Sequence, residues 1–150
     1  MHNSRVGKSP GFTLLELILV LAVIGILTAV AYPVYIDSIR ATRRSEAMSA
    51  LLHIQNLQAK YRSNHIIYGT LVEIGFTTVV PPALVVSEGG YYTFAISGVD
   101  AIAYTITATG VSGMGQENDK AGSTSCSSLT LTVAAASPRG EKAPADCWKK

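Results

Sequence analysis

Apolar residues are spread very unevenly along the chain, and their longest block lies near the N-terminus. Residues 17–36 read LILVLAVIGILTAVAYPVYI and carry no charged side chain. A helix of about twenty residues, rising about 1.5 Å per residue, crosses a hydrocarbon core of about 30 Å. Because the block is apolar on every side, it leaves no face for water, which disfavours a buried helix of a soluble protein. The pattern therefore predicts a membrane-spanning helix.

A conventional secretory signal peptide is the main alternative for this block. Such a signal has a shorter apolar region, followed by small residues of the A-x-A type at the cleavage site. Here Tyr32, Pro33 and Tyr35 follow instead, and the apolar run is longer than a signal peptide needs. These features favour a segment that stays in the mature protein.

Helical periodicity continues beyond the apolar block. Apolar residues recur at steps of three and four from Ile36 to Tyr61, with charged and polar residues between them. This is the pattern of an amphipathic helix. We therefore expect one helix from about Thr13 to about Arg62, apolar all round in its first half and amphipathic in its second half.

Two residues inside this expected helix weaken it locally. Pro33 has no N–H to donate to the carbonyl of Ala29, and its ring crowds the preceding turn. Gly25 is the second weak position, because glycine is a poor helix former. We expect the helix to bend or loosen at Gly25 and Pro33.

The periodicity changes after Asn64. Residues 64–90 contain six glycines and prolines between short apolar pieces, so we expect a connection with little regular structure. Residues 91–97 (YYTFAIS) and 103–109 (AYTITAT) are rich in aromatic and β-branched side chains. They predict two strands joined by a hairpin turn at residues 98–100.

The rest of the chain predicts one more strand between irregular segments. Residues 110–125 are small and polar and indicate a loop, whereas residues 129–133 (LTLTV) alternate as a strand does. The tail from Ser137 is again expected to be irregular. The fold class that follows is α+β, with a long N-terminal helix packed on a small antiparallel sheet.

Composition and charge narrow the function only slightly. Apolar residues make up 48% of the chain and charged residues only 15%, which fits a membrane segment. The net charge of +2 does not by itself demand a polyanionic partner. The three histidines show no metal-ligand spacing, and we expect no cofactor, no metal site and no catalytic site.

Both cysteines, Cys126 and Cys147, lie in the last quarter of the chain. Two unpaired thiols in a cytosolic protein are one interpretation. The membrane segment points instead to export, where thiols oxidise and small domains use disulfides. A bridge closing a loop of about twenty residues would stabilise the fold by about 3 kcal/mol.

The first eleven residues, MHNSRVGKSPG, are short and polar, and Arg5 and Lys8 are their only charged side chains. Basic residues just before an apolar helix favour a cytoplasmic N-terminus. The run KSPGFTLLEL at residues 8–17 ends this leader and opens the apolar helix. It resembles the prepilin peptidase site of type IV pilins, the subunits of a bacterial surface filament.

The C-terminal region supports this resemblance independently. It combines the two cysteines with Gly140, Lys142, Pro144 and Trp148. This is similar to the disulfide-bounded loop of Gram-negative type IVa pilus subunits and their minor-pilin relatives. The resemblance implies a Cys126–Cys147 bridge that presents residues 137–147 on the surface, to neighbouring subunits or receptors. It is tightest over residues 8–33.

The resemblance also implies how the chain is processed. The bond between Gly11 and Phe12 would be cut on the cytoplasmic side by a membrane aspartyl protease, and the new amino group of Phe12 would be methylated. The expected parts are a leader at residues 1–11, a membrane and filament-core helix at 12–36, and a globular head at 37–150. The chain would lie in the inner membrane as a precursor and then in the extracellular pilus.

Glu16 is the only charged residue in the first part of the apolar helix. A first-turn glutamate is favoured by the helix dipole, which is one explanation. The resemblance implies another, in which Glu16 attracts the amino group of Phe12 on a neighbouring subunit. Pairing two charges in a filament core offsets their desolvation, and the pair would set the register of incoming subunits.

The function implied is a structural subunit of a type IV pilus that supports adhesion, twitching motility or DNA uptake. Its partners would be other pilins, prepilin peptidase, the inner-membrane assembly machinery, and DNA or a host receptor. A DNA-binding minor pilin of competence is an alternative, because four cations cluster in the tail against Glu141 and Asp146. These cations are Arg139, Lys142, Lys149 and Lys150. A type II secretion pseudopilin is a third possibility, which the disulfide-closed tail disfavours.

Overall fold

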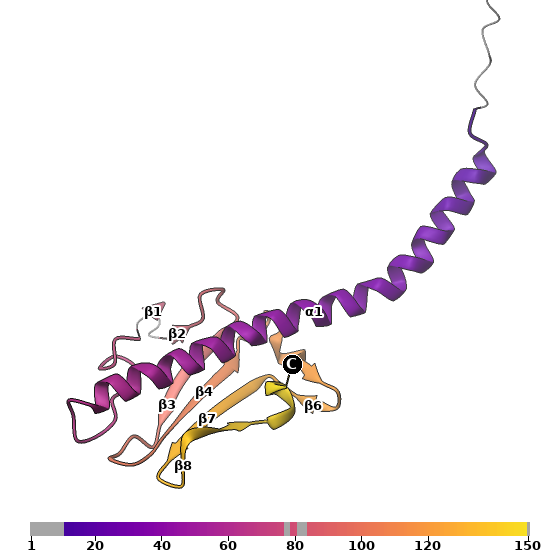
Figure 1. Cartoon of the computed structure of the whole chain (residues 1–150). Helices are drawn as coiled ribbons and strands as arrows, with labels where there is room; N and C mark the ends of the chain where they lie inside the picture. Colours follow the sequence, from indigo (N-terminus) through magenta and orange to yellow (C-terminus); the bar gives the residue numbers. More distant parts are fainter. Residues whose placement is uncertain (1–10, 77–78, 81–83, 150) are drawn as a thin grey trace, which may run out of the picture. The chain divides into compact units, whose positions relative to one another are not determined.

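The computed structural model of the 150-residue chain describes residues 11–76, 79–80 and 84–149 (Figure 1). The chain divides into two compact units, Met1–Ile36 and Asp37–Lys150. The helix α1 (Leu14–Arg62) begins in the first unit and ends in the second. Its bounds confirm the helix expected from about Thr13 to about Arg62.

In the first unit, α1 is long and apolar enough to cross a membrane, and its apolar stretch is exposed within the part of the chain that the structure describes. Thr13 caps the helix, because its Oγ1 accepts a hydrogen bond of 3.2 Å from the N–H of Glu16. The helix continues through Gly25 and Pro33 without a break. Their role in loosening the helix within a filament therefore stays a prediction.

In the second unit, six strands form one antiparallel sheet in the order β1-β2-β3-β4-β7-β8 (Figure 1). Their bounds are Val79–Val80, Leu84–Val86, Tyr92–Ser97, Tyr104–Gly110, Ser128–Ala134 and Ser137–Ala143. A separate hairpin pairs β5 (Lys120–Ala121) with β6 (Thr124–Ser125). Two short 3-10 helices complete the unit, η1 (Gln116–Asn118) and η2 (Ala145–Trp148).

The core lies between the second half of α1 and one face of the sheet (Figure 1). Alternation in β4 and β7 turns every second residue inward, and Ile106, Leu129 and Leu131 are fully buried. Leu51 and Ile54 of α1, one turn apart, are fully buried as well. The amphipathic pattern thus selects the face of α1 that packs on the sheet.

The tail was the clearest error of the sequence prediction. Residues 137–143 are not irregular but form β8, which pairs antiparallel with β7. Pro138 is compatible with this edge strand because its missing N–H need not face a neighbour. Gly140 has a φ of +83°, and a Cβ there would lie 3.0 Å from Cδ2 of Leu131. A glycine is therefore required where this strand passes close to the core.

Two other segments expected to be irregular also carry short elements. Residues 64–90 include β1 and β2, and residues 110–125 include η1 and the β5–β6 hairpin. The three strands predicted at 91–97, 103–109 and 129–133 are confirmed as β3, β4 and β7, with ends shifted by about one residue.

Gln58 fixes the loop that follows α1. This fully buried side chain accepts a 2.9 Å hydrogen bond from the N–H of Gly69 and donates another to the carbonyl of Gly69. Because both the N–H and the carbonyl of Gly69 bond to Gln58, the irregular loop is held against the helix at this residue.

We expect Gln58→Leu to lower the free energy of unfolding by about 2–3 kcal/mol, because it leaves two buried backbone groups of Gly69 without partners. Urea unfolding of the full chain in detergent micelles, followed by circular dichroism, measures this. Gln55→Leu serves as the control, since Gln55 makes a single exposed hydrogen bond to Arg139. Equal destabilisation by the two variants would contradict the proposed role of Gln58.

Candidate functional site

The expected processing junction is open to solvent. Gly11 is exposed, and a Cβ built on it would meet nothing within 4 Å. Phe12 is 86% exposed and Glu16 is exposed in the first turn of α1. Nothing among the described residues obstructs the bond between residues 11 and 12. The remainder of the expected leader, residues 1–10, lies outside the described residues.

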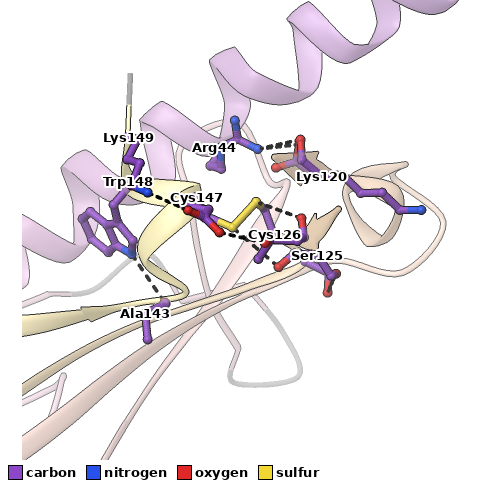
Figure 2. The surroundings of a disulfide bond; sticks show 12 residues. Arg44, Lys120, Ser125, Cys126, Ala143, Cys147, Trp148 and Lys149 are labelled. Carbon is purple, nitrogen blue, oxygen red and sulfur yellow. Dashed lines mark hydrogen bonds and ion pairs between the residues drawn. A yellow bond between two sulfur atoms is a disulfide. The ribbon is translucent and has the colours of Figure 1, made fainter. Parts of the chain in front are cut away.

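The two cysteines form a disulfide with a Cα–Cα distance of 5.7 Å, which confirms the expected pairing (Figure 2). Both are fully buried, and the bridge joins the segment just before β7 to η2. A hydrogen bond of 3.0 Å from Oγ1 of Thr124 to Asp146 supports the same junction. The bridge therefore fastens the end of the chain to the sheet rather than enclosing an irregular loop.

Trp148 lies beside the bridge and covers the end of β8 (Figure 2). Its Nε1 donates a hydrogen bond of 3.4 Å to the carbonyl of Ala143. The Nζ of Lys142 lies 5.1 Å from the centre of its ring, within the range of a cation–π interaction. The aromatic ring and the bridge together hold β8 and η2 in place.

Of the four tail cations, the structure places three on adjoining elements. Arg139 and Lys142 belong to β8, and Lys149 follows η2. The Nζ of Lys149 lies 2.7 Å from Asp146, and this hydrogen bond is the main reason why the pKa of the Asp146 carboxyl is lowered. Lys149 thus forms an exposed ion pair with Asp146. Lys150 lies outside the described residues.

Three arginines of α1 hold the loop before β7, and this role was not predicted. Arg40 donates to the carbonyl of Gly115 and Arg43 to that of Met114, each at 3.1 Å. Arg44 forms an ion pair of 2.9 Å with Asp119 and also donates to the carbonyl of Lys120. The spacing of these arginines at i, i+3 and i+4 was the available signal, because it places them on one helix face.

The Arg44–Asp119 pair is buried, with side chains 11% and 2% exposed. Burial raises the pKa of the Asp119 carboxyl, and the positive charge of Arg44 opposes that rise. Oδ2 of Asp119 and Oε1 of the neighbouring Gln116 have no hydrogen-bond partner among the described residues. The loop is therefore held by a buried ion pair. Removing either residue would leave the other charge buried without a partner, which destabilises the fold.

Removing the bridge is expected to destabilise the second unit. Cys126→Ser combined with Cys147→Ser should lower the free energy of unfolding by about 3 kcal/mol. The unfolded chain then regains the conformational freedom that the bridge, between residues 21 positions apart, had restricted. The only tryptophan of the chain, Trp148, reports the loss through its fluorescence during urea unfolding in micelles. Reduced wild type should match the variant. An unchanged unfolding midpoint in both would contradict the expectation.

Comparison with known proteins first defines the class. Residues 7–32 match the family model described as "Prokaryotic N-terminal methylation motif". That stretch contains the exposed junction at Gly11 and the first part of the apolar helix. An apolar helix behind such a motif, continued into a head with an antiparallel sheet and a C-terminal disulfide, defines a type IV pilin.

A second match, which covers most of the head, identifies the family within this class. Residues 33–130, about two thirds of the chain, match the model described as "Type IV minor pilin ComP, DNA uptake sequence receptor". The chain therefore belongs to the ComP family of type IV minor pilins. This confirms both the resemblance and the fold expected from the sequence.

Two curated relatives agree with this family. Over 70 residues, 46% of this chain, it is 39% identical to "Type IV major pilin protein PilA" of Myxococcus xanthus (strain DK1622). Over 39 residues, 26% of this chain, it is 51% identical to "Fimbrial protein EcpC" of Eikenella corrodens. The matches span only 32% and 26% of the lengths of these relatives.

Proposed function

We propose that this chain is a minor type IV pilin that binds DNA at the cell surface for uptake. The observation that carries the proposal is the family match over residues 33–130, which extends from the end of the apolar stretch of α1 into β7. The family is described as a receptor for a DNA uptake sequence. Adhesion or twitching motility through a filament of the same kind of subunit is the second candidate, favoured by the relative named as a major pilin.

The proposed route to the surface begins with the leader. Prepilin peptidase would remove residues 1–11, and the processed chain would stay in the inner membrane through residues 12–36. The assembly machinery would then insert it into a filament among other pilins, with residues 37–150 as the head. The disulfide-closed tail favours a subunit of a pilus over a pseudopilin of a type II secretion system.

Glu16 is proposed to guide this insertion by pairing with the amino group of Phe12 on a neighbour. We expect Glu16→Gln to reduce the amount of the protein in sheared filaments several-fold, because the glutamine cannot neutralise a buried amino group. Immunoblots of sheared and cell-bound fractions measure this. Cleavage at residue 11 should be unchanged. A normal yield in filaments would leave only the dipole and capping role for Glu16.

The proposed DNA contact uses cations that form no hydrogen bond or ion pair within the head. Arg40, Arg43, Arg44 and Arg62 all donate to backbone carbonyls or carboxylates within the head. Among the described residues, the cationic side chains outside the apolar unit that make no hydrogen bond or ion pair are Lys60, Lys120, Arg139 and Lys142. Arg139 and Lys142 both lie on β8, so this strand offers two cations for DNA phosphates, although Lys142 also lies over the ring of Trp148.

The test is the salt dependence of DNA binding by the full chain in detergent micelles. Fluorescence anisotropy with a 20-base-pair duplex should give a log–log dependence on salt that is linear, since phosphate contacts release counterions. Arg139→Ala with Lys142→Ala should weaken binding and lower the slope by about two, one for each lost phosphate contact. Lys149→Ala, whose ammonium group is already on Asp146, is the matched control. Binding that is absent at low salt would refute the proposed function.

A further inference from the structure

A hollow of about 350 Å³ lies between α1, strands β4 and β7 of the sheet, and the first residues of β8. Its volume lies at the lower end of the range of about 300–1,000 Å³ that is typical of small-molecule sites. One wall is fixed, because Nε2 of Gln55 donates a 3.1 Å hydrogen bond to the carbonyl of Arg139.

Tyr104 lines this hollow and is only 2% exposed. Its hydroxyl group makes no hydrogen bond with a described residue and is not one of the fully buried polar atoms without a partner, so it reaches the solvent in the hollow. Burial raises the pKa of this hydroxyl, so that it remains a proton donor at neutral pH. The hollow therefore contains a donor that lacks an acceptor.

The other walls specify the chemistry of what would fit. The ring of Tyr68 meets that of Tyr104 edge-on, with centroids 4.6 Å apart. Asn56 and Arg139 also line the hollow, and no aspartate or glutamate is among the described lining residues. The aromatic ring of Tyr68, an asparagine, a hydroxyl donor and an arginine suit a planar ring with acceptor atoms that is attached to an anion.

We propose that this hollow receives one nucleotide of bound DNA, with the base against the half-buried ring of Tyr68 and next to the hydroxyl of Tyr104, and with its phosphate near Arg139. The proposal rests on the DNA binding proposed above and places a contact with a base within it. Base edges in a duplex are recessed in the grooves, so a concave site can read a base only after the base has left the stack. A receptor that distinguishes sequences needs something beyond phosphate contacts, which carry no sequence information, and a contact with an extruded base is one way to supply it.

The test compares two 20-base-pair probes, one fully paired and one with a single bulged adenine replaced by 2-aminopurine. A base already outside the stack spares the cost of extrusion, so the full chain in micelles should bind the bulged duplex about tenfold more tightly. Binding should also change the fluorescence of 2-aminopurine, which responds to stacking. Tyr104→Phe, which keeps the shape and removes only the hydroxyl, should reduce the preference several-fold.

Ala59→Phe is the blocking variant, because Ala59 is exposed on α1 and its side chain lines the hollow. It should abolish both the preference and the fluorescence change while leaving the affinity for the paired duplex unchanged. Leu52→Phe is the matched control, two helical turns earlier on the same exposed face and away from the hollow. It should behave as wild type.

Several outcomes would overturn the proposal. Equal affinity of the wild type for both probes, or a preference that survives Ala59→Phe, would show that no base enters the hollow. If salt-dependent binding of the paired duplex persists in those cases, the proposed DNA-binding function stands and only the base site fails. Competition by glucuronate but not by deoxyadenosine monophosphate, relieved by Ala59→Phe, would overturn the base site in favour of an acidic glycan.

Discussion

Gly11→Val is expected to leave the leader attached and the chain retained in the inner membrane, with no detectable amount in surface filaments. The glycine lets the backbone approach the peptidase closely, and a branched side chain at that position would block the approach. The variant does not disturb the protein itself, because a Cβ on Gly11 meets nothing within 4 Å. Mass spectrometry of the purified chain distinguishes the two forms by the mass of residues 1–11.

Gly25→Ala is the matched control for this experiment. It also replaces a glycine whose Cβ would meet open space, but it lies inside α1 and away from the junction. Its leader should be removed as in wild type. Normal cleavage of Gly11→Val after residue 11 would contradict the assigned junction, and loss of cleavage in Gly25→Ala would show that the effect is not specific to it.

The sequence predicted the parts of the fold that depend on local periodicity. α1 was predicted to within a residue or so, because a long uninterrupted apolar run leads directly into apolar residues that repeat at the helical period. Strands β4 and β7 were predicted because their threonines alternate with buried residues such as Ile106 and Leu131. In these elements, the local pattern and the tertiary packing favour the same structure.

β8 could not be predicted in this way. Its sequence SPRGEKA contains a proline, a glycine and three charged residues, which are all poor strand formers. The strand exists because β7 supplies an edge and because the disulfide and Trp148 fasten the residues that follow. Those interactions come from residues distant in the chain, which a local pattern does not contain.

The same distinction, between local sequence patterns and contacts of distant residues, applies to the candidate sites. The Cys126–Cys147 bridge was implied by the resemblance and is confirmed, whereas the processing junction, which the resemblance implied from the short run around Gly11, stays a prediction. The docking of the loop by Arg44 was not predicted, since its partner Asp119 lies 75 residues further along the chain. The hollow at Tyr104 was missed for the same reason, because α1, β4, β7 and β8 all contribute to it.

Arg44→Ala is expected to give the largest loss of stability, about 3–5 kcal/mol at neutral pH, because it leaves the carboxylate of Asp119 buried and unpaired. The pH dependence has a definite sign. The pKa of Asp119 is raised in the folded protein, and removing Arg44 raises it further by deleting the charge that opposes burial. The folded variant thus takes up a proton more readily than the unfolded chain, and this contribution to stability is lost as the pH rises through the raised pKa.

The difference between Arg44→Ala and wild type should therefore shrink as the pH falls from neutral toward 4, where protonation neutralises the buried carboxyl. Urea unfolding of both proteins in micelles, followed by Trp148 fluorescence across this range, measures it. The double variant Arg44→Met with Asp119→Leu should recover much of the stability, since two apolar side chains leave no buried charge. If the defect of Arg44→Ala were independent of pH and persisted in the double variant, it would come from lost packing of the arginine rather than from an orphaned carboxylate. The ion pair would then not be what fastens the loop between Gly110 and β7 to the helix.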